Sequence, residues 1–201
     1  MNLLLTICRA DEVMDLVRDA EQSGSPYDAV ISIEHPGAAS LTAKQGRAPR
    51  LAEEIGEKWR NKQLILVCWD VEHDRFGVPP PDKRIITKAI EFINEHAPAK
   101  ESLRLIVHCR SGKARSTALG LVLLLHETKL LPEQAVEEIV RIRPVAAPNL
   151  AIVRHGDEVL KLDGKLVAAV EADPEITERR QASERARIHQ VESRRPSQPV
   201  L

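Results

Sequence analysis

The residues of this sequence whose types and spacing could do chemistry lie between His108 and Thr117, in the stretch HCRSGKARST. Five residues separate Cys109 from Arg115, and Gly112 stands between them. An apolar segment typical of a buried strand precedes the stretch, and an apolar segment typical of a buried helix follows it. At such a junction the unpaired N–H groups of the first helical turn, together with the helix dipole, favour a bound anion. The sequence therefore predicts an anion-binding loop with a cysteine at its floor.

The other residues of the loop are expected to hold that anion. Gly112 allows the chain to curl, so that successive backbone amides converge on one bound group. Arg115, at the start of the helix, can add a planar two-pronged contact to two phosphate oxygens. The expected substrate-binding residues are Arg110, Ser111, Gly112, Lys113 and Ala114.

Cys109 is the expected nucleophile. The pKa of a free cysteine is about 8.5, and a helix N-terminus with nearby cations lowers it, so that the thiolate forms at neutral pH. Attack on a bound phosphoryl group would form a phosphocysteine and split ester hydrolysis into two easier steps. The Ser116 hydroxyl lies where it could hydrogen-bond the sulfur and help it leave in the second step. His108 is expected to organise the loop rather than to exchange protons with a substrate.

The stretch resembles the HC-x5-R-[ST] signature of the cysteine-dependent protein tyrosine phosphatases. Cys109 and Arg115 match the invariant pair, and His108 and Ser116 match the flanking positions. The compact chain and the place of the motif resemble the dual-specificity and bacterial tyrosine phosphatase-like branches. The resemblance implies a metal-independent hydrolase with no cofactor. It also implies a general acid, an aspartate on a mobile loop before the cysteine.

Two aspartates could be that acid. Asp70 directly follows an expected strand, as the acid does in compact dual-specificity phosphatases, and Asp74 lies four residues further along. The tripeptide Trp-Pro-Asp of the larger enzymes is absent, because Trp69 is followed at once by Asp70. Asp70 is the preferred acid, and Asp74 stays the alternative.

Three functions remain open. The first is a protein phosphatase acting on phosphotyrosine, with phosphoserine and phosphothreonine as further substrates. An aromatic wall for a phenyl ring could come from Trp69, Phe76 or Tyr27. The second is a phosphoinositide or inositol phosphate phosphatase, which the positive charges of Arg110 and Lys113 favour. The third is a phosphate-recognising binding module with little turnover.

Composition narrows the cellular setting. The chain has 201 residues, a net charge of −1 and 2% aromatic residues, which argues against a nucleic-acid partner. Its three cysteines form no CxxC pair, which favours a reducing compartment, and no apolar run reaches the ~20 residues of a membrane span. The histidines show no metal-ligand spacing. We therefore expect a cytoplasmic protein without a metal site.

Strand-like and helix-like segments alternate along the chain, which predicts an α/β fold with a mostly parallel central sheet flanked by helices. Asn149 is expected to cap a helix, and Pro132 to occupy the first turn of another. The expected strands are 2–7, 29–33, 64–69 and 103–108, and the expected helices are 11–20, 51–59, 83–96, 117–125, 132–143 and 150–161.

The sequence divides into residues 1–172, the expected catalytic domain, and a charged tail, 173–201. The tail is rich in Arg, Glu, Gln and Ser, which is typical of an exposed helix or a disordered segment. Cys68 is expected near the end of a strand beside the nucleophile. It is interpreted either as a buried core residue or as a redox partner of Cys109.

Overall fold

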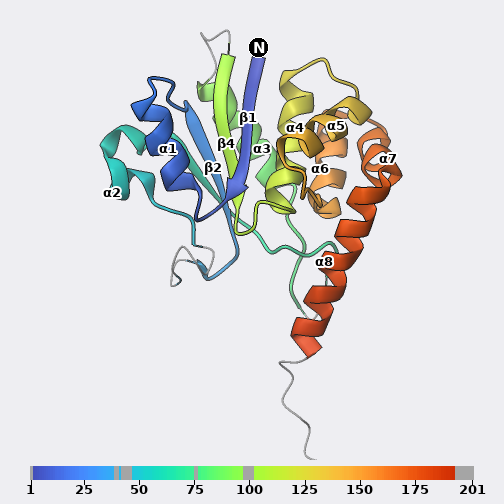
Figure 1. Ribbon diagram of the computed structural model, residues 1–201. Helices are drawn as coiled ribbons and strands as arrows, with labels where there is room; N and C mark the ends of the chain where they lie inside the picture. The colour runs from blue at the N-terminus through green and yellow to red at the C-terminus, as the bar shows by residue number, and fades with distance from the viewer. Residues whose placement is uncertain (1, 39–40, 42–46, 75–76, 97–101, 193–201) are drawn as a thin grey trace, which may run out of the picture.

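The computed structural model describes residues 2–38, 41, 47–74, 77–96 and 102–192. Strands and helices alternate from residue 2 to residue 127, and further helices follow without a strand between them (Figure 1). The strands are β1 (Asn2–Arg9), β2 (Ala29–Glu34), β3 (Gln63–Val67) and β4 (Ser102–Cys109). The helices are α1 (Val13–Gln22), α2 (Leu51–Ile55), the 3₁₀ helix η3 (Glu57–Trp59), α3 (Arg84–His96), α4 (Arg115–Glu127), α5 (Pro132–Ile142), α6 (Leu150–Leu160), α7 (Lys165–Ala172) and α8 (Pro174–Glu192).

Among the described residues the strands form one parallel sheet in the order β1-β4-β2-β3. The expected α/β class is confirmed. The expected strand 64–69 was wrong in extent and burial, because β3 ends at Val67 and lies at the sheet edge, where Val67 is 55% exposed. β4 lies between β1 and β2, so its carboxyl end is enclosed by a neighbour on each side.

Side chains alternate across the sheet and create two cores. Ile106 of β4 packs with Val13 and Val17 of α1, on the side that α1 and α2 cover. Leu105 and Val107, its neighbours in sequence, pack on the opposite side, with α3 to α7. Figure 1 shows these helices on the two faces of the sheet, with α4 to α7 gathered on one side.

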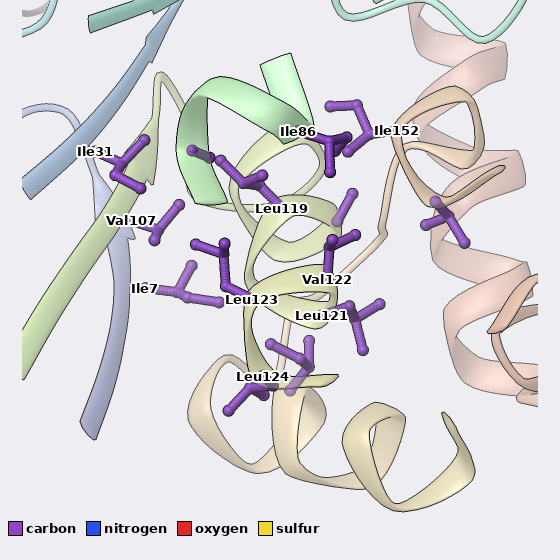
Figure 2. Close-up of a cluster of buried hydrophobic side chains, with 14 of the residues drawn as sticks. Ile7, Ile31, Ile86, Val107, Leu119, Leu121, Val122, Leu123, Leu124 and Ile152 are labelled. Atoms are coloured by element: carbon purple, nitrogen blue, oxygen red, sulfur yellow. The ribbon is translucent and has the colours of Figure 1, made fainter. Parts of the chain in front are cut away.

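Helix α4 lies at the centre of the larger core. Figure 2 shows Leu119 and Leu123 of α4 between the sheet residues Ile7 and Val107 and neighbouring helices. Every residue from Arg115 to Leu124 is buried, which confirms the expectation of an all-round apolar helix. The burial leaves α4 little freedom to move and so fixes its first turn, which begins at Arg115.

The C-terminal part of the chain is helical through residue 192. Helix α7 was not predicted from the sequence, and α8 occupies residues 174–192 of the charged tail. Ile176, near the start of α8, is fully buried in the larger core. The proposed boundary at residues 172 and 173 falls at the break between α7 and α8. That residues 1–172 alone form the catalytic domain stays a prediction.

Candidate active site

The loop between β4 and α4 contains a tight turn that requires glycine at residue 112. Cys109 is the last residue of β4 and Arg115 is the first of α4. Gly112 between them has φ +64°, in the left-handed region. A Cβ atom on Gly112 would lie 2.6 Å from the backbone oxygen of Cys8 in the neighbouring strand. The loop can therefore curl closely over β1 only with glycine at this position.

The carbonyl groups of this loop are held by residues from outside it. The carbonyl oxygens of residues 111–114 accept hydrogen bonds from the guanidinium of Arg143 and the backbone N–H groups of Ala147 and Asn149, at 2.8 to 3.4 Å. Within the described part of the chain, the backbone N–H groups of residues 111–115 donate to no protein acceptor. A loop with bound carbonyls and unbound amides is a nest for an anion.

Cys109 lies in this loop with an environment that stabilises its thiolate. Its residue is 1% exposed, and Sγ lies 3.3 Å from Oγ of Ser116. Burial opposes ionisation, but the charge of Arg115 and the hydrogen bonds from Ser116 outweigh it, so that the pKa of Cys109 is lowered. The thiolate of Cys109 therefore forms more readily than that of a free cysteine.

The other two cysteines show the opposite effect. Burial, reinforced by the charge of Glu12, raises the pKa of Cys8 to about 12. Burial also raises the pKa of Cys68 to about 11, although Arg115 counteracts it. All three cysteines are free thiols, and Cys68 packs in the larger core. Of the three buried thiols, Cys109 is therefore the one with a lowered pKa.

Arg115 is a buried cation whose donors are only partly used. The residue is 4% exposed, and Nη1 donates to the carbonyl oxygen of Cys68 at 3.0 Å. Nε is buried and has no hydrogen-bond partner within the described residues, with Oδ2 of Asp70 4.0 Å away. An unpaired donor of a buried guanidinium is costly unless a ligand completes it. The arrangement therefore fits an anion between Arg115 and the loop.

Of the two candidate acids, the structure brings Asp70 to this site. Its Oδ1 accepts a hydrogen bond from Nδ2 of Asn149 at 3.0 Å, and its side chain is 25% exposed. Asp74 is exposed, four residues further along. The predicted helix cap is confirmed, because Oδ1 of Asn149 accepts from the first backbone N–H groups of α6. The contact of its amide group with Asp70 was missed, because nothing in the local sequence signals it.

No family model and no curated protein matches the sequence. Among solved structures, human tyrosine phosphatase-like serine/threonine/tyrosine-interacting protein has a TM-score of 0.57 at 14% identity, over 79% of this chain and 92% of its own. DUSP15 has a TM-score of 0.54 at 18% identity, over 85% and 93%. The chain has the fold of the dual-specificity phosphatases.

A third structure with this phosphatase fold contains a ligand. PTPMT1 in complex with PI(5)P has a TM-score of 0.53 at 18% identity, over 79% of this chain and 91% of its own. All of these structures share the fold at low identity. The similarity therefore places the sheet and helices, and the chemistry must be argued from the side chains described above.

The imidazole of His108 is buried and links two strands of the sheet. Its Nε2 lies 2.7 Å from Oγ of Ser32 in β2, and Gln63 of β3 donates to the same hydroxyl at 2.9 Å. Burial lowers the pKa of His108 to about 4. The ring links β4 to β2 next to the nucleophile, which fits the expected organising role.

The remaining predicted residues differ in exposure and position. Gly112 and Ala114 are buried, whereas Arg110, Ser111 and Lys113 are exposed at the rim of the loop.

Of the three candidate aromatic residues, Trp69 and Tyr27 lie in the described part of the chain, and they do not lie together at the loop. Trp69 precedes Asp70 and stacks on His35, with ring centroids 5.9 Å apart. Tyr27 contacts Thr6 and Arg104 near the amino end of β4, at the opposite end of the sheet, so its proposed role as a wall of the site was wrong. Phe76 lies outside the described residues.

The described residues contain no group of three or more His, Cys, Asp or Glu side chains that could hold a metal ion. They also contain no helix with the length and hydropathy needed to cross a membrane.

Proposed function

We propose that this protein is a metal-independent phosphomonoester hydrolase that uses Cys109 as its nucleophile. The observation that carries the proposal is the lowered pKa of this buried thiol beside loop amides and an Nε of Arg115 that have no hydrogen-bond partner among the described residues. Burial alone would raise the pKa, as it does for Cys8 and Cys68. A site that stabilises a thiolate next to an anion nest supports nucleophilic attack on phosphorus.

In the first step, the thiolate of Cys109 attacks phosphorus, the S–P bond forms and the ester P–O bond breaks. Asp70 gives its proton to the leaving oxygen, so that an alcohol rather than an alkoxide departs. Arg115 and the loop amides hold the non-bridging oxygens, where charge develops in the transition state. The position of Oδ2 of Asp70, 4.0 Å from Nε of Arg115, supports this assignment over Asp74.

In the second step, a water molecule attacks the phosphocysteine. Asp70, now a carboxylate, takes the proton of the water as the new P–O bond forms. The S–P bond breaks, and its electron pair returns to sulfur as the thiolate, with inorganic phosphate as the product. Ser116 stabilises that thiolate, because its hydroxyl lies 3.3 Å from Sγ.

The favoured substrate is a phosphotyrosine-containing protein. With Cys109 only 1% exposed, the phosphate must be carried on a side chain that reaches into the loop. A phenyl ring provides this reach, and phosphoserine and phosphothreonine, with shorter side chains, are secondary candidates. The reducing compartment inferred from free cysteines supports a cytoplasmic substrate.

A phosphoinositide or inositol phosphate is the second candidate substrate. The exposed side chains of Arg110 and Lys113 place two cations beside the nest, where additional phosphate groups of such a ligand would lie. PTPMT1, which shares the fold, is known as a complex with PI(5)P.

A binding module with little turnover is the candidate from another class. One structure with this fold is described as a tyrosine phosphatase-like interacting protein. A binding module requires the anion nest but gains nothing from a stabilised thiolate. The lowered pKa of Cys109 therefore favours the enzyme.

The test is hydrolysis of p-nitrophenyl phosphate, a phosphotyrosine peptide and a phosphoinositide in the presence of EDTA. Turnover that resists EDTA and disappears in Cys109→Ser is expected, with Cys8→Ser as the control for loss of a buried thiol. If the phosphoinositide is hydrolysed faster than the phosphotyrosine peptide, and the double variant Arg110→Ala with Lys113→Ala loses that preference, the second candidate is established. Phosphopeptide binding by the reduced wild type without turnover would establish the binding module.

A further inference from the structure

The C-terminal helix α8 reaches the segment that carries Asp70. Nη2 of Arg180 lies 2.8 Å from Oε2 of Glu72, across 108 positions of sequence. The side chains are 14% and 20% exposed, so this ion pair is largely shielded from solvent. In Figure 1, α8 runs beside the chain that follows β3. Removing one partner of such a shielded pair is costly, because it leaves the other charge uncompensated.

Glu72 connects this pair to the start of α6. Its Oε1 accepts a hydrogen bond from the backbone N–H of Leu150 at 3.2 Å. The preceding residue, Asn149, donates from Nδ2 to Oδ1 of Asp70 at 3.0 Å and to the carbonyl oxygen of Val71 at 3.3 Å. Residues 70–72 are therefore held by α6 at three atoms and by α8 at a fourth.

The contact between α8 and this segment depends on the ion pair. A groove of about 500 Å³ opens beside the pair, with Glu72 and Ala147 on one side and Thr177, Gln181 and Glu184 of α8 on the other. Side chains do not fill this space, so apolar packing does not join α8 to residues 70–72 there. The neighbouring Arg179 pairs instead with Glu175 of its own helix.

We propose that Arg180 is a positioning residue that, through Glu72, keeps Asp70 beside Arg115 for proton transfer to the leaving group. The proposal rests on the proposed function, because it assigns α8 a part in the same reaction. Without the charge of Arg180, Glu72 is left as a shielded carboxylate with one backbone donor and turns toward solvent. Residues 70–72 then lose their contact with α8, and Asp70 spends less time in reach of the leaving oxygen.

The kinetic test uses the leaving group as the readout. Arg180→Met removes the charge and keeps much of the aliphatic stem. A general acid matters for a poor leaving group and little for an acidic one, and it contributes ~10²–10⁴-fold. We expect kcat/KM for phenyl phosphate to fall by roughly tenfold, a part of that range, and kcat/KM for a fluorinated umbelliferyl phosphate to change less than about twofold. The readout is kcat/KM because it reports the first step alone, whereas kcat also includes the second step, in which Asp70 is the base.

Reference variants define the outcome. Asp70→Asn should show the same dependence on the leaving group with a larger loss. Arg179→Met, which breaks a pair within α8, should match the wild type on both substrates. Glu72→Gln should reproduce Arg180→Met, and the double variant should lose no more than either single one. Equal losses of kcat/KM on both substrates, or additive losses in the double variant, would overturn the proposal.

A second measurement separates this proposal from the proposed function. Hydrogen–deuterium exchange of the amides in residues 70–74, in a Cys109→Ser background, should be faster in Arg180→Met and restored in Arg180→Lys. Unchanged exchange would overturn the positioning role whether or not the protein is a phosphatase. If the wild type turned over no phosphate ester, the proposed function would fail, and the acceleration would still assign the ion pair its role in holding the segment. Melting temperatures of all variants identify any that fail to fold.

Discussion

The buried imidazole of His108 makes the stability of this protein depend on pH in a window that one substitution can remove. Burial moves the pKa from 6.5 to about 4 in the folded chain. Between these values the unfolded chain binds a proton that the folded chain does not, so the free energy of unfolding decreases as pH falls. Above pH 6.5 the imidazole of His108 does not make the free energy of unfolding depend on pH. The full shift of its pKa from 6.5 to about 4 corresponds to about 3 kcal/mol, which is lost as the pH falls to about 4.

The perturbation is His108→Gln, because the amide end of glutamine can take the place of Nε2 and keep the hydrogen bond with Ser32. The free energy of unfolding of both proteins is measured by urea denaturation from above pH 6.5 down to about 4. Other groups titrate in both proteins alike, so the difference between the two curves isolates His108. The free energy of unfolding of the wild type, relative to that of His108→Gln, should decrease by about 3 kcal/mol toward low pH. Parallel curves would refute the assignment of a neutral, desolvated imidazole.

Four further predictions concern the packing of glycines and the chemistry of the thiols. Iodoacetamide should alkylate Cys109 with a pH midpoint below the ~8.5 of a free thiol, and leave the other two cysteines unmodified in the folded protein, as peptide mass spectrometry would show. Gly112→Ala should cost ~2 kcal/mol or more, from left-handed strain together with the clash on Cys8, and abolish turnover. Gly77→Ala, at φ +76° with open space around it, should cost only the strain of ~1–2 kcal/mol in a thermal melt. Gly156→Ala places a Cβ 2.1 Å from Cγ2 of Val122 and should cost ~1–3 kcal/mol, partly recovered by Val122→Ala; additive losses would contradict it.

Local patterns predicted the elements that depend on neighbours in sequence. Pro132 begins α5 and Asn149 caps α6, as expected, because both act on amides within three residues. The all-round apolar stretch after the loop predicted the burial of α4, since such a helix has no face suited to water. The alternation of strands and helices was sufficient for the α/β class.

Contacts between distant segments were beyond sequence reasoning. Arg143 holds the carbonyl groups of the loop, and Arg180 holds Glu72, yet an exposed arginine on a helix would have the same local sequence. The choice between Asp70 and Asp74 is of the same kind. Residue counts allowed both, and the partner that distinguishes Asp70 is Asn149, which lies 79 positions away in the chain.

The strand order also determines when this sheet can assemble during synthesis. β2 and β3 lie close in sequence and can pair early, but β1 has β4 as its sheet neighbour within the described strands. A ribosome adding ~5–20 residues per second needs ~5–20 s for the roughly 100 residues between them. During that time the apolar edges of β1 and β2 have no neighbour, which invites pairing with other chains. The segment that ends in Cys109 thus completes the sheet late, and the loop after it can be held in place only once Arg143, Ala147 and Asn149 have also been synthesised.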